Sequence, residues 1–301
     1  MKTRVPILIA VLFLNGCAVK RFTVNRVGDA LATGGTSFSS DDDPQIVREA
    51  APFSLKLMES LLAESPRHRA LLLATTSGFT QYGYAFVQQD ADELEAKDLA
   101  AATALRLRAR KLYLRACDYG LRGLDVNHRG FTQVLRADAK KAVRVATKRD
   151  VPLLYWTAAA WGAAISVSKD KPDIVADLPK VEALIDRALQ LDEGFDHGAI
   201  HSFLISYEMA RPGVKDDEAV WRAKRHFERA MELSGGQSAS PLVAYAEAVC
   251  VQKQQKAEFD KLLKQALAID ADQKPEWRLT NLVLQRRAHW LLSREDELFA
   301  E

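Results

Sequence analysis

The segment "RHFERAMELSGGQ", residues 225–237, decides the fold class of this chain. It has helical spacing, ends in Ala-x-x-Leu and is followed by Ser and Gly. The same arrangement returns in "ALIDRALQLDEGF", residues 183–195, and, with Ile in place of Leu, in "KLLKQALAIDADQ", residues 261–273. The matched positions are 42 and 36 residues apart and are occupied by Ala188, Ala230 and Ala266. Self-similarity at such intervals is typical of stacked helical hairpins.

Two further patterns, Ala223-x₃-Phe227-x₂-Ala230 and Ala109-x₃-Tyr113-x₂-Ala116, fit the second helix of a tetratricopeptide repeat. In that repeat the small residues let paired helices approach, and the aromatic ring fills the space between hairpins. The pattern of the first helix is poorly kept, and the intervals depart from the usual one of about 34 residues. The sequence therefore predicts an all-α fold of antiparallel helical hairpins, in which divergent tetratricopeptide-like repeats form an α-solenoid-like domain.

Apolar residues recur at helical spacing from Pro44 onward, and no run shows the alternation of a strand. Asp43 is expected to cap the first helix rather than to bind a metal, because proline at the next position has no N–H to lose. Pro52 is expected to kink or split that helix near Ala51. Its apolar stripe is predicted to comprise Ile46, Ala50, Phe53, Leu57 and Leu61, with Val47, Met58 and Leu62 beside it. Further helices are expected over 67–89, 93–121, 132–149, 152–168, 180–191, 196–210, 217–234, 240–253, 256–270 and 275–292.

The first residues, "MKTRVPILIAVLFLNGC", have the form of a signal peptide, with a basic start and an apolar stretch too short to span a bilayer. Leu14 and Gly16 before Cys17 resemble the bacterial lipobox, so cleavage before Cys17 and lipidation of its thiol are expected. Ala18, where Asp would retain a lipoprotein in the inner membrane, favours the outer membrane. The predicted parts are a signal peptide 1–16, a lipidated N-terminus and tether 17–40, and a single helical domain 41–301.

The net charge of +2 belongs to this signal, because removing Lys2 and Arg4 leaves 40 basic and 40 acidic residues. A neutral mature chain gives no reason to expect nucleic acid as a partner.

Four stretches in order give the chain a family resemblance: "DDDPQIVREAAPFSLKLMESLLAESP", "YWTAAAWGAAISVSKDKPDIVADLP", "HFERAMELSGG" and "WRLTNLVLQRRAHWLLSREDELF". With them the chain resembles the T-component lipoproteins of TRAP transporters (TatT-type), over about residues 20–301. The resemblance implies an all-helical fold with cryptic tetratricopeptide-like hairpins and a lipid anchor at Cys17. It also implies a homotrimer with a channel through each protomer, and association with the periplasmic solute-binding protein, the P-component of a TRAP system.

Aromatic and amide residues are the candidates for lining such a channel. In "LLYWTAAAWGAA", residues 153–164, rings stand among small residues, which suits either a ligand channel or plain core packing. Tyrosines of "GFTQYGYAF" and two amides on one face of the last long helix could border the same space, because buried amides need partners or a wet cavity. The candidate lining residues are Tyr82, Tyr84, Tyr155, Trp156, Trp161, Asn281 and Gln285.

Basic residues recur at i, i+4 steps and would form one cationic edge on a helix over 132–149. Outside the cytoplasm such an edge suits an acidic protein surface or an anionic ligand, and the alternative is a solvated face paired with neighbouring acids. The candidate residues are Arg136, Lys140, Arg144 and Lys148.

No catalytic motif has positive support. "HGAIH" places His197 and His201 one helical turn apart, but Gly198 stands where a zinc protease has glutamate, so packed histidines are favoured over a metal site. Cys117 and Cys250 suit buried thiols, and a disulfide between them is left open. We therefore expect a non-enzymatic TRAP accessory protein without a cofactor. The alternatives are an envelope-assembly scaffold and, less favoured, a zinc hydrolase.

Overall fold

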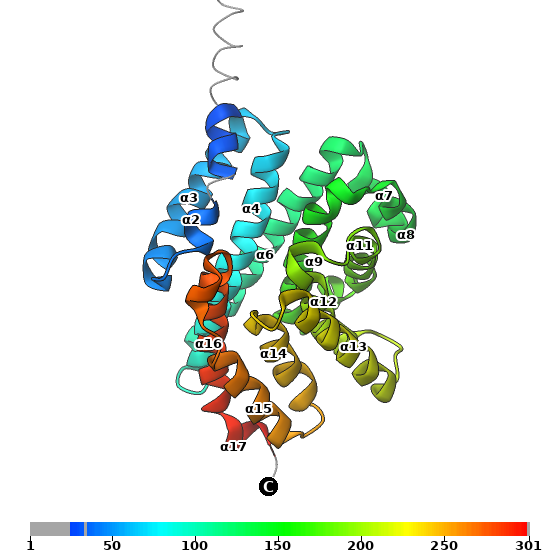
Figure 1. Ribbon diagram of the computed structural model, residues 1–301. Coiled ribbons are helices and arrows are strands. Elements are labelled where there is room, and N and C mark those ends of the chain that lie inside the picture. Colours follow the sequence, from blue (N-terminus) through cyan, green and yellow to red (C-terminus); the bar gives the residue numbers. More distant parts are fainter. Residues whose placement is uncertain (1–24, 33–34, 300–301) are drawn as a thin grey trace, which may run out of the picture.

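The computed structural model describes residues 25–32 and 35–299. Within these ranges the chain is helical and contains no strand, which confirms the predicted all-α class (Figure 1). Cys17 and the predicted signal peptide lie outside the described residues. No helix in the described ranges is long and apolar enough to cross a membrane.

The first half of the chain forms a row of packed helices, each in contact with the next along the row. Small residues make the close contacts: Ala109, Tyr113 and Ala116 of one helix are fully buried, as the repeat pattern predicts. The row consists of α3 (Pro44–Glu64), α4 (Arg69–Tyr82), α6 (Leu99–Asn127), α9 (Val151–Ser166) and α11 (Leu178–Leu191). Between α4 and α6 lie a π-helical segment, η1 (Gly83–Gln88), and α5 (Gln89–Leu94).

The second half continues as hairpins, with α12 packed on α13 and α14 on α15. Ala223 and Ala230 are buried at the predicted positions. These helices are α12 (Ala199–Ala210), α13 (Asp216–Ser234), α14 (Ala239–Tyr245), α15 (Lys256–Leu267), α16 (Arg278–Leu292) and α17 (Glu295–Leu298). A second π-helical segment, η5 (Ala246–Cys250), extends α14.

The first long helix keeps its predicted cap and part of its predicted core face. The Asp43 carboxylate accepts hydrogen bonds from the N–H groups of Gln45 and Ile46, at 2.8 and 3.2 Å. However, Ile46 is 58% exposed and Phe53 is 74% exposed. The side chains buried against the neighbouring helices are Val47, Leu55 and Leu62. The predicted stripe was therefore wrong at Ile46 and Phe53, whereas Val47 and Leu62, which were predicted to lie beside it, are buried.

The expected split at Pro52 does not occur, since α3 runs unbroken from Pro44 to Glu64. The lost hydrogen bond is tolerated because buried leucines on the C-terminal side and Val47 on the N-terminal side fix both halves of the helix.

The continuous helix expected over 132–149 is replaced by four short segments. Asp138 ends the first and caps the second, with its carboxylate accepting from the Lys141 N–H at 2.9 Å. A residue that caps a new helix takes extended dihedral angles, so the two helices cannot be continuous. The segments are α7 (Phe131–Ala137), α8 (Ala139–Ala142), η2 (Val143–Val145) and η3 (Lys148–Asp150).

The predicted tether is helical from residue 25 to 32 and again in α2 (Gly35–Ser39). Ser65 binds the side chain of Asn25 at 2.8 Å, and α2 contacts α16. The part of the predicted tether that the structure describes therefore packs on the helical body.

The last long helix, α16, returns to the beginning of the chain. It contacts α2 and α3, and Figure 1 shows it beside the blue and cyan helices of the first half. Because helices from the beginning of the chain pack against α16, this helix is not an exposed edge of the solenoid.

Candidate functional site

Two arginines of α16 bind acidic residues of α5, and one of these acids also binds α3. Arg286 donates to Asp90 at 2.9 Å and to Glu93 at 2.6 Å, both of α5. Arg48 of α3 binds the same Asp90 carboxylate through both of its terminal nitrogens, at 2.8 and 2.6 Å. Asp90 thus bridges the first long helix to the last.

Arg287 is the buried member of this group, with 7% of its side chain exposed. It donates to Asp92 at 2.8 Å, binds Glu247 of η5, and lies 4.2 Å from the centre of the Trp290 ring. We call the set Arg48, Asp90, Asp92, Glu93, Glu247, Arg286 and Arg287 the closure network. Because paired buried charges are costly to separate, this network fixes α16 against α5 and η5.

Tyr84 is the predicted channel residue that the structure places at the closure network. It lies in the π-helical segment η1, where burial raises the pKa of its phenol to about 12. The charge of Arg287 lowers this pKa and that of Glu247 raises it. Both π-helical segments, η1 and η5, therefore contribute a side chain to this centre, and such segments are frequent at functional positions. Tyr84 is neutral at physiological pH and can serve as a hydrogen-bonding group beside paired charges.

The other candidate channel residues lie in several places. Tyr82 is half-buried near Arg108, whose terminal nitrogen is 3.4 Å from its hydroxyl. Tyr155 packs on Trp156 and Phe195, with ring centres 5.0 and 5.3 Å apart. Trp161 is buried on α9, with the Lys180 ammonium 5.6 Å from its ring.

The two amides of α16 bind backbone groups. Asn281 accepts from the Ala239 N–H at 3.0 Å and donates to the Gln237 carbonyl at 3.1 Å, which fixes the start of α14. Gln285 donates to carbonyls at the end of α15, including that of Ile269 at 2.8 Å. The role of these seven residues in lining a channel remains a prediction.

The four predicted cationic residues are all exposed, but they do not share one helix face. Arg136 lies on α7, Lys140 on α8, Arg144 in η2 and Lys148 in η3, because Asp138 interrupts the helix. Lys148 pairs with Asp192 at 3.2 Å. The predicted cationic edge on one helix is therefore wrong. The four residues lie in a basic segment of short helices, most of which pack against α11.

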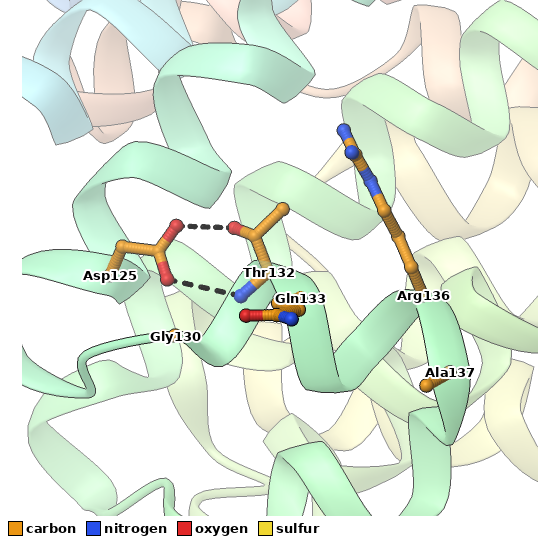
Figure 2. A pocket seen from close by; sticks show the side chains of 6 residues that line it. All are labelled: Asp125, Gly130, Thr132, Gln133, Arg136 and Ala137. Carbon is orange, nitrogen blue, oxygen red and sulfur yellow. Dashed lines mark hydrogen bonds between the residues drawn. The ribbon is translucent and has the colours of Figure 1, made fainter.

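Arg136 also borders a surface hollow of about 590 Å³. Its remaining lining residues are Asp125, Gly130, Thr132, Gln133 and Ala137. Figure 2 shows Asp125 bound to the N–H and hydroxyl of Thr132, while the Arg136 side chain points away from that pair. The Asp125 carboxylate therefore fixes the start of α7 through Thr132. Arg136 is the cationic side chain among the residues that line the hollow.

The two histidines of "HGAIH" do not form a helical pair. His197 lies in the short segment η4 (Phe195–Gly198) with φ of 51°, whereas His201 belongs to α12. His197 packs on Trp277, with ring centres 4.8 Å apart, and Nδ1 of His201 lies 2.8 Å from Nδ1 of His226 on α13. Among the residues described, no three or more His, Cys, Asp or Glu side chains are grouped to hold a metal ion.

Cys117 and Cys250 are both buried and free. They belong to separate hydrophobic clusters, one in each half of the chain.

Sequence reasoning missed the closure network and His226. The adjacent pair Arg286 and Arg287, between the apolar residues Leu284 and Ala288, was a usable signal, because a charge inside an apolar stripe needs a partner. Nothing in the sequence assigned that partner to α5.

Comparison with known proteins adds two findings. The family model described as TRAP transporter T-component matches residues 40–299. A protein of Treponema pallidum (strain Nichols), described as an uncharacterized protein, is 28% identical over 308 aligned residues, which cover 96% of this chain and 95% of that protein.

Proposed function

Because this chain belongs to the TRAP transporter T-component family and so has an accessory role in a TRAP transport system, we propose that it binds the periplasmic solute-binding protein of that system. The observation that carries this proposal is the family match over residues 40–299, nearly the whole helical domain. A rigid helical-repeat body offers an extended surface of the kind used to bind proteins.

The proposed docking surface is the basic segment formed by Arg136, Lys140, Arg144 and Lys148. All four side chains are exposed, and those of Lys140 and Arg144 form no ion pair in the described structure. Exposed charges at the rim of an interface steer association and make it salt-dependent. The fitting partner is an acidic face of the solute-binding protein.

We also propose that a small solute, anionic or hydrophobic, is sheltered in or passed through the helical body. The residues proposed to line its path remain Tyr82, Tyr84, Tyr155, Trp156, Trp161, Asn281 and Gln285. Tyr84 is the best-supported candidate among them, because its neutral hydroxyl lies near the paired charges of the closure network. A homotrimeric assembly belongs to the same proposal.

The chain is further proposed to be anchored in the cell envelope by lipid on Cys17, facing the periplasm and most consistent with the outer membrane. Replacing Cys17 with Ala should release the protein from membranes without unfolding it. Retention of the variant on membranes after a salt wash would contradict the anchor.

Co-purification tests the partner. The tagged full chain, isolated from cell envelopes, is expected to bring down a TRAP solute-binding protein. A Lys140→Glu, Arg144→Glu variant should recover less of it. The control Lys215→Glu, Lys224→Glu should not, although these two lysines, directly before and on α13, are also exposed. Recovery of an envelope-assembly machine in its place would favour the scaffold alternative.

A further inference from the structure

The described chain begins at one end of the molecule, beside the loop between α3 and α4. The Ser65 hydroxyl donates to the Asn25 side chain at 2.8 Å, and a ring nitrogen of His68 lies 3.2 Å from the Asn25 carbonyl oxygen. Figure 1 shows the corresponding dark blue helix at the upper end of the molecule. Residue 25 is therefore held against the body at this end.

The same end holds the C-terminus of α6 and the start of α9. Arg67 donates to the Val126 carbonyl at 3.3 Å, and Arg122 donates to the Pro66 carbonyl at 3.2 Å. Arg69 donates to the Arg149 carbonyl at 2.6 Å. These contacts join the α3–α4 loop to the end of α6 and to η3.

A buried carboxylate organises this junction. Asp150, with 2% of its side chain exposed, binds Arg69 at 3.1 Å, His128 at 2.9 Å and Asn127 at 3.3 Å. Its negative charge is thus used inside the junction. Arg149, which precedes Asp150, and Arg129, which follows His128, are both exposed.

We define the arginine end as Arg67, Arg122, Arg129 and Arg149, all of them exposed. Arg67 and Arg122 donate to carbonyl groups, and in the described structure no side chain of the four forms a salt bridge with a carboxylate. Of the nearby acids, Asp29 pairs with His68 at 3.3 Å, Asp118 faces both Arg122 and Arg136, and Glu64, at the end of α3, is exposed. The arginine end therefore presents positive charge to solvent.

We infer that the arginine end rests on an anionic membrane surface, with phospholipid phosphates as its ligands. The inference rests on the proposed lipidation of Cys17, which is 8 positions before Asn25 in the sequence. A chain of that length spans at most about 29 Å, so the lipid would hold this end of the body near the bilayer. Guanidinium groups bind phosphate oxygens through two parallel hydrogen bonds, and each basic residue near an anionic bilayer adds to the attraction.

Vesicle flotation of the purified Cys17→Ala chain tests the arginine end without the lipid. Vesicles of phosphatidylcholine alone are compared with vesicles in which about a third of the lipid is phosphatidylglycerol. Adding Arg129→Ala and Arg149→Ala removes two exposed cations whose side chains form no hydrogen bond or ion pair in the described structure, so the fold should be unaffected. The matched control adds Lys215→Ala, directly before α13, and Lys224→Ala on α13, which lowers the net charge by the same amount.

The Arg129→Ala, Arg149→Ala chain is expected to partition onto the anionic vesicles about 25-fold more weakly than its parent at low salt, about fivefold for each residue. The control should change much less, and neither should differ on phosphatidylcholine. Equal partitioning of the test and control variants would overturn the inference.

The mass of the wild-type protein isolated from membranes reports the anchor separately. An added diacylglycerol mass with no arginine dependence of flotation would keep the anchor and refute the arginine end. An unmodified Cys17 with arginine-dependent flotation would refute the anchor and leave the arginine end as a membrane-binding surface.

Discussion

The Arg287 guanidinium donates a hydrogen bond to the Asp92 carboxylate at 2.8 Å, although the two residues are 195 positions apart in the chain. This contact lies where the last long helix meets α5. Glu247 completes the pairing from η5, so a single arginine holds segments from three parts of the sequence together. The closure network therefore turns a row of hairpins into a body whose last long helix is fixed to its beginning.

Replacing Arg287 with Met should destabilise the protein by about 1–3 kcal/mol, because Glu247 would lose its arginine partner and Asp92 would keep only Arg106, at 3.2 Å. Urea unfolding measures this as a lower midpoint. Arg286→Met is the matched control: its side chain is 38% exposed, so about 1 kcal/mol is expected. Equal losses for the two variants would contradict the special role of Arg287.

Replacing Gly120 with Ala should destabilise the junction of α4, α6 and α9 by about 1–3 kcal/mol. The added Cβ would lie 2.1 Å from Oγ1 of Thr157 and 3.2 Å from Cγ2 of Thr76. Thr157→Ala should recover part of the loss when combined with it, and unfolding curves of the single and double variants measure the coupling. Gly194→Ala, whose nearest neighbouring atom is 3.9 Å away, should change stability by less than about 0.5 kcal/mol.

Stability should fall as the pH drops from neutrality, in part through the His201 and His226 pair. Burial lowers the pKa of both rings, that of His226 to about 4, and the cations Arg211, Arg222 and Arg225 act on His226 in the same direction. His201 also faces Glu193 and Arg229, and Glu208 lies 3.9 Å from His226. An unfolded histidine titrates near 6.5, so between pH 6.5 and about 4 the unfolded chain binds more protons and gains stability relative to the folded one.

His226→Gln removes one of these titrating rings. The wild type should lose on the order of 1 kcal/mol more than this variant between neutral pH and about pH 5, measured by urea unfolding at each pH. Parallel pH dependences of the two proteins would show that His226 is not the group responsible.

Cys117 and Cys250 should be inert toward thiol reagents in the folded protein. Both are buried, and burial raises the pKa of Cys250 to about 12 and also raises that of Cys117. In the Cys17→Ala chain, unfolding without a reductant should expose both thiols to labelling. Failure to label either one until a reductant is added would indicate a disulfide and contradict the free thiols.

The repeat positions could be predicted from sequence because they depend on local spacing. Ala109, Tyr113, Ala223 and Ala230 follow the pattern of close-packed hairpins, and Asp43 caps its helix through neighbouring residues. The break at Asp138 also had a local signal, a capping residue inside an expected helix.

Features that depend on distant partners could not be predicted in this way. Ile46 and Val47 are about equally apolar, and Val47 is the buried one because it packs in a cluster with Phe86 of η1 and Val283 of α16. Arg287 meets Asp92, and His201 meets His226, only after the helices have packed. The candidate site residue Tyr84 was named from its aromatic character, but its place beside Arg287 depends on the return of α16.

The most direct test of the proposed role is the mass of the particle formed when the purified protein is mixed with a TRAP solute-binding protein of its own organism. Light scattering after gel filtration should find one complex that contains both proteins, and added salt should weaken it because the proposed docking surface is basic. Separate elution of the two proteins at concentrations well above those of the cell would contradict the account.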